Sequence, residues 1–194
     1  MEVLVICTGN ICRSPIAAQL LQARLDGIGV SAEVSSAGTR AMVGEPMTPE
    51  AMDALAALGV EPMPHRARQL TDALIRGSEL ILTATRAHRA EVASLVPAAA
   101  RRAYTLREFA RVASVVGAEL PTPPDDLFRA LIATAPTQRG FAAPPAFPED
   151  DDIVDPYRRP PEVYAEAAGL IDLAIAGFAE PSPAPSGWGG GDGT

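Results

Sequence analysis

Short apolar runs alternate with longer stretches of helical periodicity along most of the chain. Runs rich in apolar and β-branched residues predict four strands, at residues 3–6, 32–36, 80–83 and 102–105. Apolar residues at helical spacing predict helices at residues 15–25, 48–58, 66–75, 85–95, 106–116, 125–134 and 161–178. Strands that alternate with helices in this way imply right-handed crossovers, so the pattern predicts an α/β fold with a parallel sheet.

Two stretches depart from this alternation. Residues 117–152 hold seven of the 19 prolines, and a connection of this length is usually a functional loop or a mobile segment. From residue 180 the chain is mainly Pro, Ser and Gly, so we expect a disordered tail over residues 179–194. The sequence therefore predicts one domain, residues 1–178, with an atypical insertion at 113–152.

Composition excludes several classes of protein. The 194 residues carry 16 positive side chains, all of them Arg, against 24 Asp and Glu, which gives a net charge of −8. Such a chain is a poor general binder of nucleic acid or anionic membranes. Two cysteines cannot form a disulfide framework or supply a four-ligand zinc site. No apolar run is long enough for a signal peptide or a spanning helix, so we expect a cytoplasmic protein.

The most informative motif follows the first predicted strand. Residues 7–15 are Cys-Thr-Gly-Asn-Ile-Cys-Arg-Ser-Pro, and Pro15 suits the first turn of a helix. Backbone N–H groups of such a loop, together with the positive end of the helix dipole, form an anion nest of phosphate size. Gly9 lets the backbone turn tightly, and Asn10 tolerates a left-handed conformation. Arg13 adds a planar fork for two phosphate oxygens, and the same positive field favours a thiolate at Cys7. The motif therefore predicts a cysteine nucleophile beneath a bound phosphate, where a lone Cys would indicate only packing.

Transfer of a phosphoryl group to sulfur also requires a proton for the departing oxygen. Asp155 is the best candidate, because Pro156 holds it in an extended conformation within a stiffened loop. A carboxylic acid there can protonate the leaving oxygen and afterwards, as a carboxylate, accept a proton from water. A solvated acid in an acidic loop is the alternative, since residues 149–152 are all acidic.

The loop at residues 7–15 and the Asp-Pro-Tyr sequence at 155–157 resemble the low-molecular-weight protein tyrosine phosphatase family. The resemblance spans residues 1–112 and 153–178, and segments 36–38 and 65–69 also match. It implies a three-layer αβα fold with a four-stranded, twisted parallel sheet, and no metal or cofactor. It also implies Cys7 as the nucleophile of a phosphocysteine intermediate, Arg13 as the phosphate clamp, and Asp155 as general acid and then base.

The resemblance assigns roles to further residues of the loop and its surroundings. Ser14 would stabilise the thiolate by a hydrogen bond, while Ser36 and His65 would hold the loop in shape together with Asn10. We expect His65 to support the loop rather than to carry protons, and His88 to be solvated between Arg86 and Arg89 on a surface helix. The predicted phosphate-binding and substrate-binding residues are Thr8, Gly9, Asn10, Ile11, Cys12, Ser14, Met42 and Tyr157.

Several positions bear on the substrate. A deep nest selects a long aromatic phosphate over phosphoserine. Ile11 lines the mouth at a position that resembles Thr in the protein-arginine phosphatases, so it favours phosphotyrosine. Met42 stands where many relatives carry an aromatic wall, and Tyr157 either stacks on the substrate ring or is a half-buried loop residue. The expected partner is therefore a phosphotyrosine-containing protein.

Other features leave alternatives open. Thr85 replaces an Asp that is common in the family, although Thr can still cap the helix that follows. Cys12 either closes a protective disulfide with Cys7, as it can in relatives, or only packs. The insertion at 113–152 is either a lid or docking surface, or a benign surface addition.

Three other functions compete with a tyrosine phosphatase. A thiol-coupled arsenate reductase would bind a similar anion, but the chain has no Cys beyond residue 12 for a relay through cysteines. A protein-arginine phosphatase would use the same loop. A non-catalytic phosphotyrosine-binding module would keep the nest and lose the nucleophile or the acid, both of which are present here.

Overall fold

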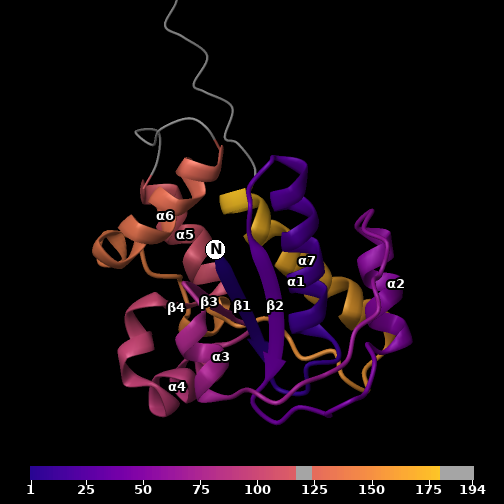
Figure 1. Ribbon diagram of the computed structural model, residues 1–194. Helices are drawn as coiled ribbons and strands as arrows, with labels where there is room; N and C mark the ends of the chain where they lie inside the picture. Colours follow the sequence, from indigo (N-terminus) through magenta and orange to yellow (C-terminus); the bar gives the residue numbers. More distant parts are fainter. Residues whose placement is uncertain (117–123, 180–194) are drawn as a thin grey trace, which may run out of the picture.

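The computed structural model describes residues 1–116 and 124–179, and it places four parallel strands at the centre of the molecule (Figure 1). They are β1 (Glu2–Cys7), β2 (Glu33–Gly38), β3 (Leu80–Thr83) and β4 (Ala103–Thr105). Their order in the sheet is β2-β1-β3-β4, with every neighbouring pair parallel. All four predicted strands are confirmed to within one or two residues. Their carboxyl ends lie at one edge of the sheet, where parallel α/β folds form their binding crevices.

Both faces of the central strand are buried, which explains its continuous apolar run. Val3 and Val5 belong to one hydrophobic cluster, while Leu4 and Ile6 belong to a second cluster on the opposite face. Alternate residues of a strand point to opposite faces, so β1 needs apolar side chains at each position. The predicted three-layer αβα arrangement is confirmed, with helices on both faces of the sheet (Figure 1).

The larger layer contains α1 (Arg13–Gly27), α2 (Pro49–Ala57), α5 (Leu106–Val116) and α7 (Pro161–Ala179). The ring of Phe109 in α5 meets that of Phe178 in α7 edge to face, with centroids 4.9 Å apart. The smaller layer contains α3 (Asp72–Gly77), α4 (Arg86–Leu95) and the 3₁₀ helix η1 (Pro97–Arg102). Thr48 and Thr85 cap α2 and α4 as predicted, each accepting a hydrogen bond from a backbone N–H.

The helix predicted at residues 66–75 is wrong for its first part, because α3 begins only at Asp72. Residues 66–70 are extended instead and run beside the end of β2. The N–H of Gly38 donates to the carbonyl of Arg68 at 3.0 Å, and the N–H of Leu70 donates to the carbonyl of Gly38 at 2.8 Å. These backbone bonds to the edge strand replace the bonds that a helix would have made.

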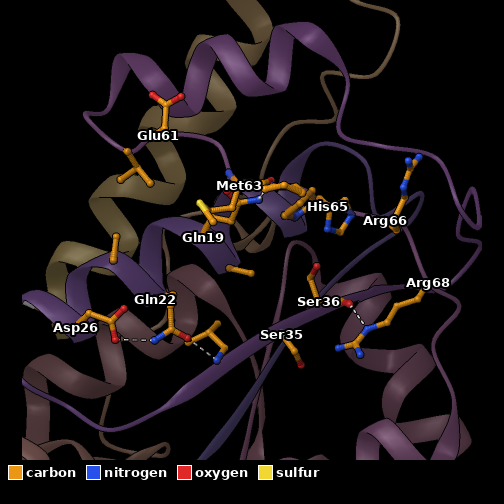
Figure 2. A pocket seen from close by; sticks show the side chains of 16 residues that line it. Gln19, Gln22, Asp26, Ser35, Ser36, Glu61, Met63, His65, Arg66 and Arg68 are labelled. Carbon is orange, nitrogen blue, oxygen red and sulfur yellow. Dashed lines mark hydrogen bonds between the residues drawn. The ribbon is translucent and has the colours of Figure 1, made fainter.

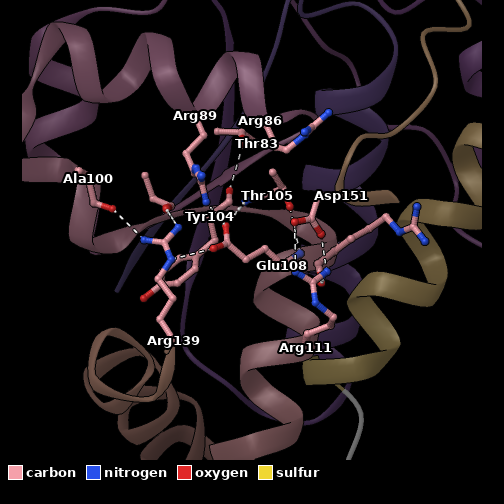
Figure 3. Close-up of polar contacts among 12 residues, drawn as sticks. Thr83, Arg86, Arg89, Ala100, Tyr104, Thr105, Glu108, Arg111, Arg139 and Asp151 are labelled. Atoms are coloured by element: carbon pink, nitrogen blue, oxygen red, sulfur yellow. Dashed lines mark hydrogen bonds and ion pairs between the residues drawn. The ribbon is translucent and has the colours of Figure 1, made fainter. Parts of the chain in front are cut away.

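The predicted insertion contributes to the core. Its helix α6 (Pro124–Gln138) buries Phe128, Leu131 and Ala135, and the Phe128 ring stacks near Phe178 with centroids 6.5 Å apart. Beyond the helix, the Nε of Arg139 donates to Glu108 at 2.7 Å (Figure 3). The description of a benign surface addition is therefore wrong for α6. Residues 117–123 and 180–194, which include nearly all of the predicted tail, lie outside the described residues; Ala179 ends α7.

Candidate active site

The loop that joins β1 to α1 forms the floor of the site. Asn10 has a φ of 57°, in the left-handed region, as its position in the motif predicted. Gly9 is not among the glycines with positive φ, so the turn takes its left-handed residue from Asn10 rather than from Gly9. The first residue of α1 is Arg13, and Cys7 is the last residue of β1.

A buried network of hydrogen bonds holds Asn10 in this conformation. Its Nδ2 donates to the hydroxyl oxygens of Ser14, at 2.9 Å, and Ser36, at 2.8 Å. Its Oδ1 accepts the backbone N–H of Arg68 at 2.9 Å. The network ties the loop to α1, to β2 and to the extended segment that replaced the predicted helix. The structure therefore brings together Asn10, Ser14 and Ser36, and places Asn10 and Ser14 beneath the cavity rather than on its wall.

His65 contacts the backbone of Asn10. Its Nε2 lies 2.7 Å from the carbonyl oxygen of Asn10, which can only accept, so Nε2 carries the proton. Burial lowers the pKa of His65, with a smaller contribution from the charge of Arg68, and the ring is therefore held neutral. This arrangement agrees with the predicted supporting position of His65.

A second, wider groove lies beside this network (Figure 2). It measures about 570 Å³ and runs between α1, β2 and the segment at residues 60–68. Ser36, His65 and Arg68 form part of its wall, whereas Cys7 does not. The groove is therefore separate from the predicted catalytic residues Cys7, Arg13 and Asp155, which line a smaller cavity.

That smaller cavity, of about 170 Å³, opens above the loop. The Cys7 side chain is only 2% exposed, and its Sγ lies 3.0 Å from the hydroxyl oxygen of Ser14. A hydroxyl at this distance can donate to a thiolate, as the resemblance implied. The lining residues are Cys7, Thr8, Gly9, Ile11, Cys12, Arg13, Arg40, Met42, Asp155 and Tyr157.

Arg13 and Asp155 meet across this cavity although they lie far apart in the sequence. Arg13 is 4% exposed, and its Nη2 lies 3.1 Å from Oδ1 of Asp155. The other terminal nitrogen, Nη1, donates to the carbonyl oxygen of Ile153 at 3.1 Å. The guanidinium thus contacts both the backbone and the side chain of the Asp155 loop. The Asp155 carboxylate itself is 58% exposed, so it faces the cavity entrance.

The outer wall contains predicted and unpredicted residues. Ile11 is buried, whereas Met42 is 39% exposed at the mouth. Tyr157 lines the cavity, and the guanidinium of Arg158 lies over its ring at 5.1 Å. Arg40 was not predicted, because nothing in its local sequence distinguishes it; it reaches the cavity through the loop after β2. The lining therefore combines apolar side chains with the charged side chains of Arg40 and Asp155.

The prediction of a solvated His88 is wrong. The side chain is 4% exposed, with Nε2 2.9 Å from the hydroxyl of Thr8 and Nδ1 2.8 Å from that of Thr85. Burial, followed by the positive charges of Arg13 and Arg40, lowers its pKa to about 4. Neutral His88 thus links the loop between β1 and α1 to the first turn of α4. The flanking arginines suggested an exposed helix face, and only the tertiary fold shows that this face meets Thr8.

Cys12 occupies a different environment from Cys7. Both residues are free thiols. Burial raises the pKa of the Cys12 thiol to about 11, although hydrogen bonds to Thr48 and Tyr164 act in the opposite direction. Its Sγ lies 3.7 Å from the Thr48 hydroxyl. Cys12 is therefore protonated at neutral pH, and a protonated thiol is a poor nucleophile.

Gly38 supports the loop by its lack of a side chain. A Cβ at this position would lie 2.4 Å from the carbonyl oxygen of Thr8 and 3.0 Å from Ala41. The carboxyl end of β2 therefore packs directly on the backbone of the loop between β1 and α1. This close approach explains a glycine at the end of a strand, where glycine otherwise weakens pairing.

A buried thiol and a guanidinium lie at the carboxyl edge of a parallel sheet, in the turn between a strand and a helix N-terminus. This arrangement is typical of α/β proteins that bind an anion at a helix N-terminus. Comparison with known proteins narrows this class. A family model described as low molecular weight phosphotyrosine protein phosphatase matches residues 2–133. The chain belongs to this family and is a phosphatase.

Individual relatives agree with this assignment. The chain is 41% identical over 173 residues to the probable low molecular weight protein-tyrosine-phosphatase EpsP of Ralstonia nicotianae, covering 89% of this chain and 90% of the relative. It is 30% identical over 180 residues to a protein-arginine-phosphatase of Geobacillus stearothermophilus, covering 92% and 94%. Among solved structures, the low molecular weight protein tyrosine phosphatase of T. tengcongensis has a TM-score of 0.67 at 28% identity, with 91% and 96% covered.

Proposed function

We propose that this phosphatase hydrolyses phosphotyrosine in proteins through a phosphocysteine intermediate on Cys7. The observation that carries the proposal is the convergence of Cys7, Arg13 and Asp155 on one small cavity. The three residues supply a sulfur nucleophile, a fixed cation for the phosphate oxygens and a carboxyl group at the entrance. They come from a strand end, a helix start and a distant loop, and only the fold brings them together.

The reaction consists of two displacements at phosphorus. In the first, the Cys7 thiolate attacks phosphorus, the bond from phosphorus to the aryl oxygen breaks, and protonated Asp155 gives its proton to that oxygen. In the second, water attacks the phosphocysteine, the Asp155 carboxylate accepts a proton from the water, and the phosphorus–sulfur bond breaks. Phosphate leaves and Cys7 is again a thiolate. Arg13 balances the charge of the phosphate oxygens in both steps.

The cavity favours an aryl phosphate over an alkyl one. Cys7 lies at the floor with almost no exposure, so the phosphate must descend below the rim to reach sulfur. The side chain of phosphotyrosine is long enough to span this depth, and that of phosphoserine is shorter. Ile11 and Met42 give the wall an apolar surface for the ring, and Tyr157 adds an aromatic one. The relative named protein-tyrosine-phosphatase supports the same choice.

Trapping the intermediate tests the proposal directly. A phosphotyrosine peptide would be mixed with the enzyme, the reaction quenched within milliseconds, and the chain analysed by mass spectrometry for phosphate on sulfur. We expect the adduct on Cys7 in the wild type and its absence in Cys7→Ser. The Cys12→Ser variant is the matched control, because it removes the neighbouring thiol of the same loop. Adduct formation on Cys12, or turnover by Cys7→Ser near that of the wild type, would refute the assignment.

A substrate panel separates the competing functions. Peptides of one sequence would carry phosphotyrosine, phosphoserine or phosphoarginine, with arsenate and a thiol reductant in a parallel assay. Phosphate release mainly from phosphotyrosine is expected. Faster release from phosphoarginine would assign the activity of the Geobacillus relative. Thiol consumption with arsenate would indicate a reductase, and binding without turnover would indicate a phosphotyrosine-binding module.

A further inference from the structure

Asp155 itself is weakly held, although the proposed reaction depends on its position. Its side chain is largely exposed, and within residues 1–116 and 124–179 it makes an ion pair with Arg13 and accepts a 3.4 Å hydrogen bond from the N–H of Tyr157 in the same loop. Once a phosphate occupies Arg13, that ion pair is shared with the substrate. The position of the carboxyl group must then come from the backbone that leads into it.

That backbone is fixed two and three residues earlier. The N–H of Ile153 donates to the carbonyl of Ala84 at 2.8 Å, and the Ile153 side chain is buried. Asp152 accepts three hydrogen bonds from Arg86: from the backbone N–H at 2.7 Å, from Nε at 3.2 Å and from Nη2 at 3.0 Å. Burial opposes ionisation of Asp152, but the bonds from Arg86 outweigh it and lower the pKa of the carboxyl group.

The partner of Asp152 belongs to the same helical turn that holds the phosphate loop. Arg86 is the first residue of α4, and His88, two residues later, contacts Thr8 at 2.9 Å. The first turn of α4 therefore contacts the loop of the nucleophile through His88 and the loop of the acid through Arg86. Both loops are held by the same helical turn. This shared support can keep the Asp155 carboxyl group within reach of an oxygen above Cys7.

We propose that Asp152 is a positioning residue for the reaction, which fixes the Asp155 loop on the first turn of α4 through its bonds to Arg86. The inference rests on the proposed function, since it presumes that Asp155 donates the proton. The neighbouring acid, Asp151, does not make this connection. It pairs with Arg111 of α5 instead and anchors the end of the insertion (Figure 3).

The dependence of the rate on the leaving group tests this role. kcat/KM would be measured for phenyl phosphate, whose leaving oxygen needs a proton, and for p-nitrophenyl phosphate, whose leaving oxygen needs one much less. For Asp152→Ala we expect about a tenfold loss with phenyl phosphate, a fraction of the ~10²–10⁴ that a general acid contributes, and a loss under about threefold with p-nitrophenyl phosphate. Arg86→Gln, which keeps the backbone N–H bond to Asp152, should show a smaller difference of the same sign.

Asp172→Ala is the matched control. The Asp172 side chain is 31% exposed, as is that of Asp152, and it pairs with Arg24 at 2.7 Å between α1 and α7. This variant should lower both rates equally or not at all. Equal losses with both substrates in Asp152→Ala and Arg86→Gln would overturn the positioning role. If Asp152→Ala does not fold, Arg86→Gln decides the question by the same criterion.

Asp155→Asn, run in the same assay, distinguishes failure of this inference from failure of the proposed function. A large loss for phenyl phosphate in Asp155→Asn, without the smaller one in Asp152→Ala, would leave the function intact and remove the inference. Equal losses with both substrates in Asp155→Asn would show that Asp155 is not the acid, and the inference would fail with it.

Discussion

The guanidinium of Arg13 lies 3.1 Å from the carboxylate of Asp155, with 141 residues between them in the sequence. The same guanidinium is almost fully buried, so its direction is fixed by the fold rather than by solvent. A phosphate that enters the cavity meets a cation whose desolvation has already occurred on folding. Such preorganised charge is the kind of electrostatic stabilisation that contributes most to catalysis.

Arg13→Lys should therefore impair catalysis strongly although the charge is kept. An ammonium group cannot contact the Ile153 carbonyl and two phosphate oxygens with the geometry of a planar fork. We expect kcat to fall by about 10²–10³, comparable to the loss of one preorganised donor. Steady-state kinetics with p-nitrophenyl phosphate would measure it. Arg40→Lys, at the exposed rim, is the control and should lose far less. A loss in Arg13→Lys as small as that in Arg40→Lys would show that charge alone suffices.

Ser36→Ala should weaken both stability and activity. The substitution leaves the buried Nδ2 of Asn10 with one partner instead of two, which costs about 1–3 kcal/mol. Urea unfolding measures the free energy, and kcat shows whether the phosphate loop has loosened. Ser35→Ala is the matched control on the same strand. The Ser35 hydroxyl makes only a 3.5 Å bond to the Val3 carbonyl, so a change within about 0.5 kcal/mol is expected.

Gly38→Ala should destabilise the protein by about 1–3 kcal/mol or more, because its Cβ would press on the Thr8 carbonyl. Since backbone atoms cannot move aside without displacing the loop, activity should fall with stability. Gly169→Ala is the control: this helical position in α7 has no atom within 4 Å of a new Cβ, and about 0.5–1 kcal/mol of stabilisation is expected. Thermal denaturation of both variants would check the contrast, and an unaffected Gly38→Ala would contradict the close approach.

Stability should fall as the pH is lowered from about 6.5 to about 4. Over that range unfolded His88 takes up a proton and folded His88, with its pKa lowered to about 4, does not, so protons favour the unfolded chain. His65 acts with the same sign because its pKa is also lowered. His88→Gln should remove up to about 3 kcal/mol of this dependence. Urea unfolding at several pH values, compared with the wild type, would test it.

The pH dependence of His88→Gln must be compared with that of the wild type, because carboxylates also titrate near the lower end of this pH range. Burial opposes ionisation of Glu108, but Arg139 and Arg89 outweigh it and lower its pKa. That contribution is common to both proteins and cancels in the difference. Identical pH profiles of wild type and His88→Gln would show that the buried imidazole is not responsible. His65→Gln, measured alongside, separates the second histidine.

Local sequence signals predicted most of the sheet, the helix caps and the loop at residues 7–15. These features depend on neighbouring residues: β-branched runs, Thr before a helix, and a Cys and an Arg with five residues between them. The helix prediction for residues 66–70 failed because the backbone of this segment pairs with Gly38, which no local pattern reveals. The prediction of a solvated His88 failed for a related reason, since its contact with Thr8 joins residues 80 positions apart. Arg40 and the bond between Arg86 and Asp152 also depend on the tertiary fold alone.

The position of α7 determines when the hydrophobic core can be completed during synthesis. This last described helix covers α1 and α5 with buried residues such as Ile171, Ile175 and Phe178, and the Asp155 loop immediately precedes it. During synthesis, Cys7 leaves the ribosome early, while Asp155 and the helix that closes the core leave more than 140 residues later. A nascent or prematurely terminated chain therefore carries the reactive loop without a completed core. Because domains fold as units, the cavity can take its final shape only once α7 is available to pack on α1 and α5.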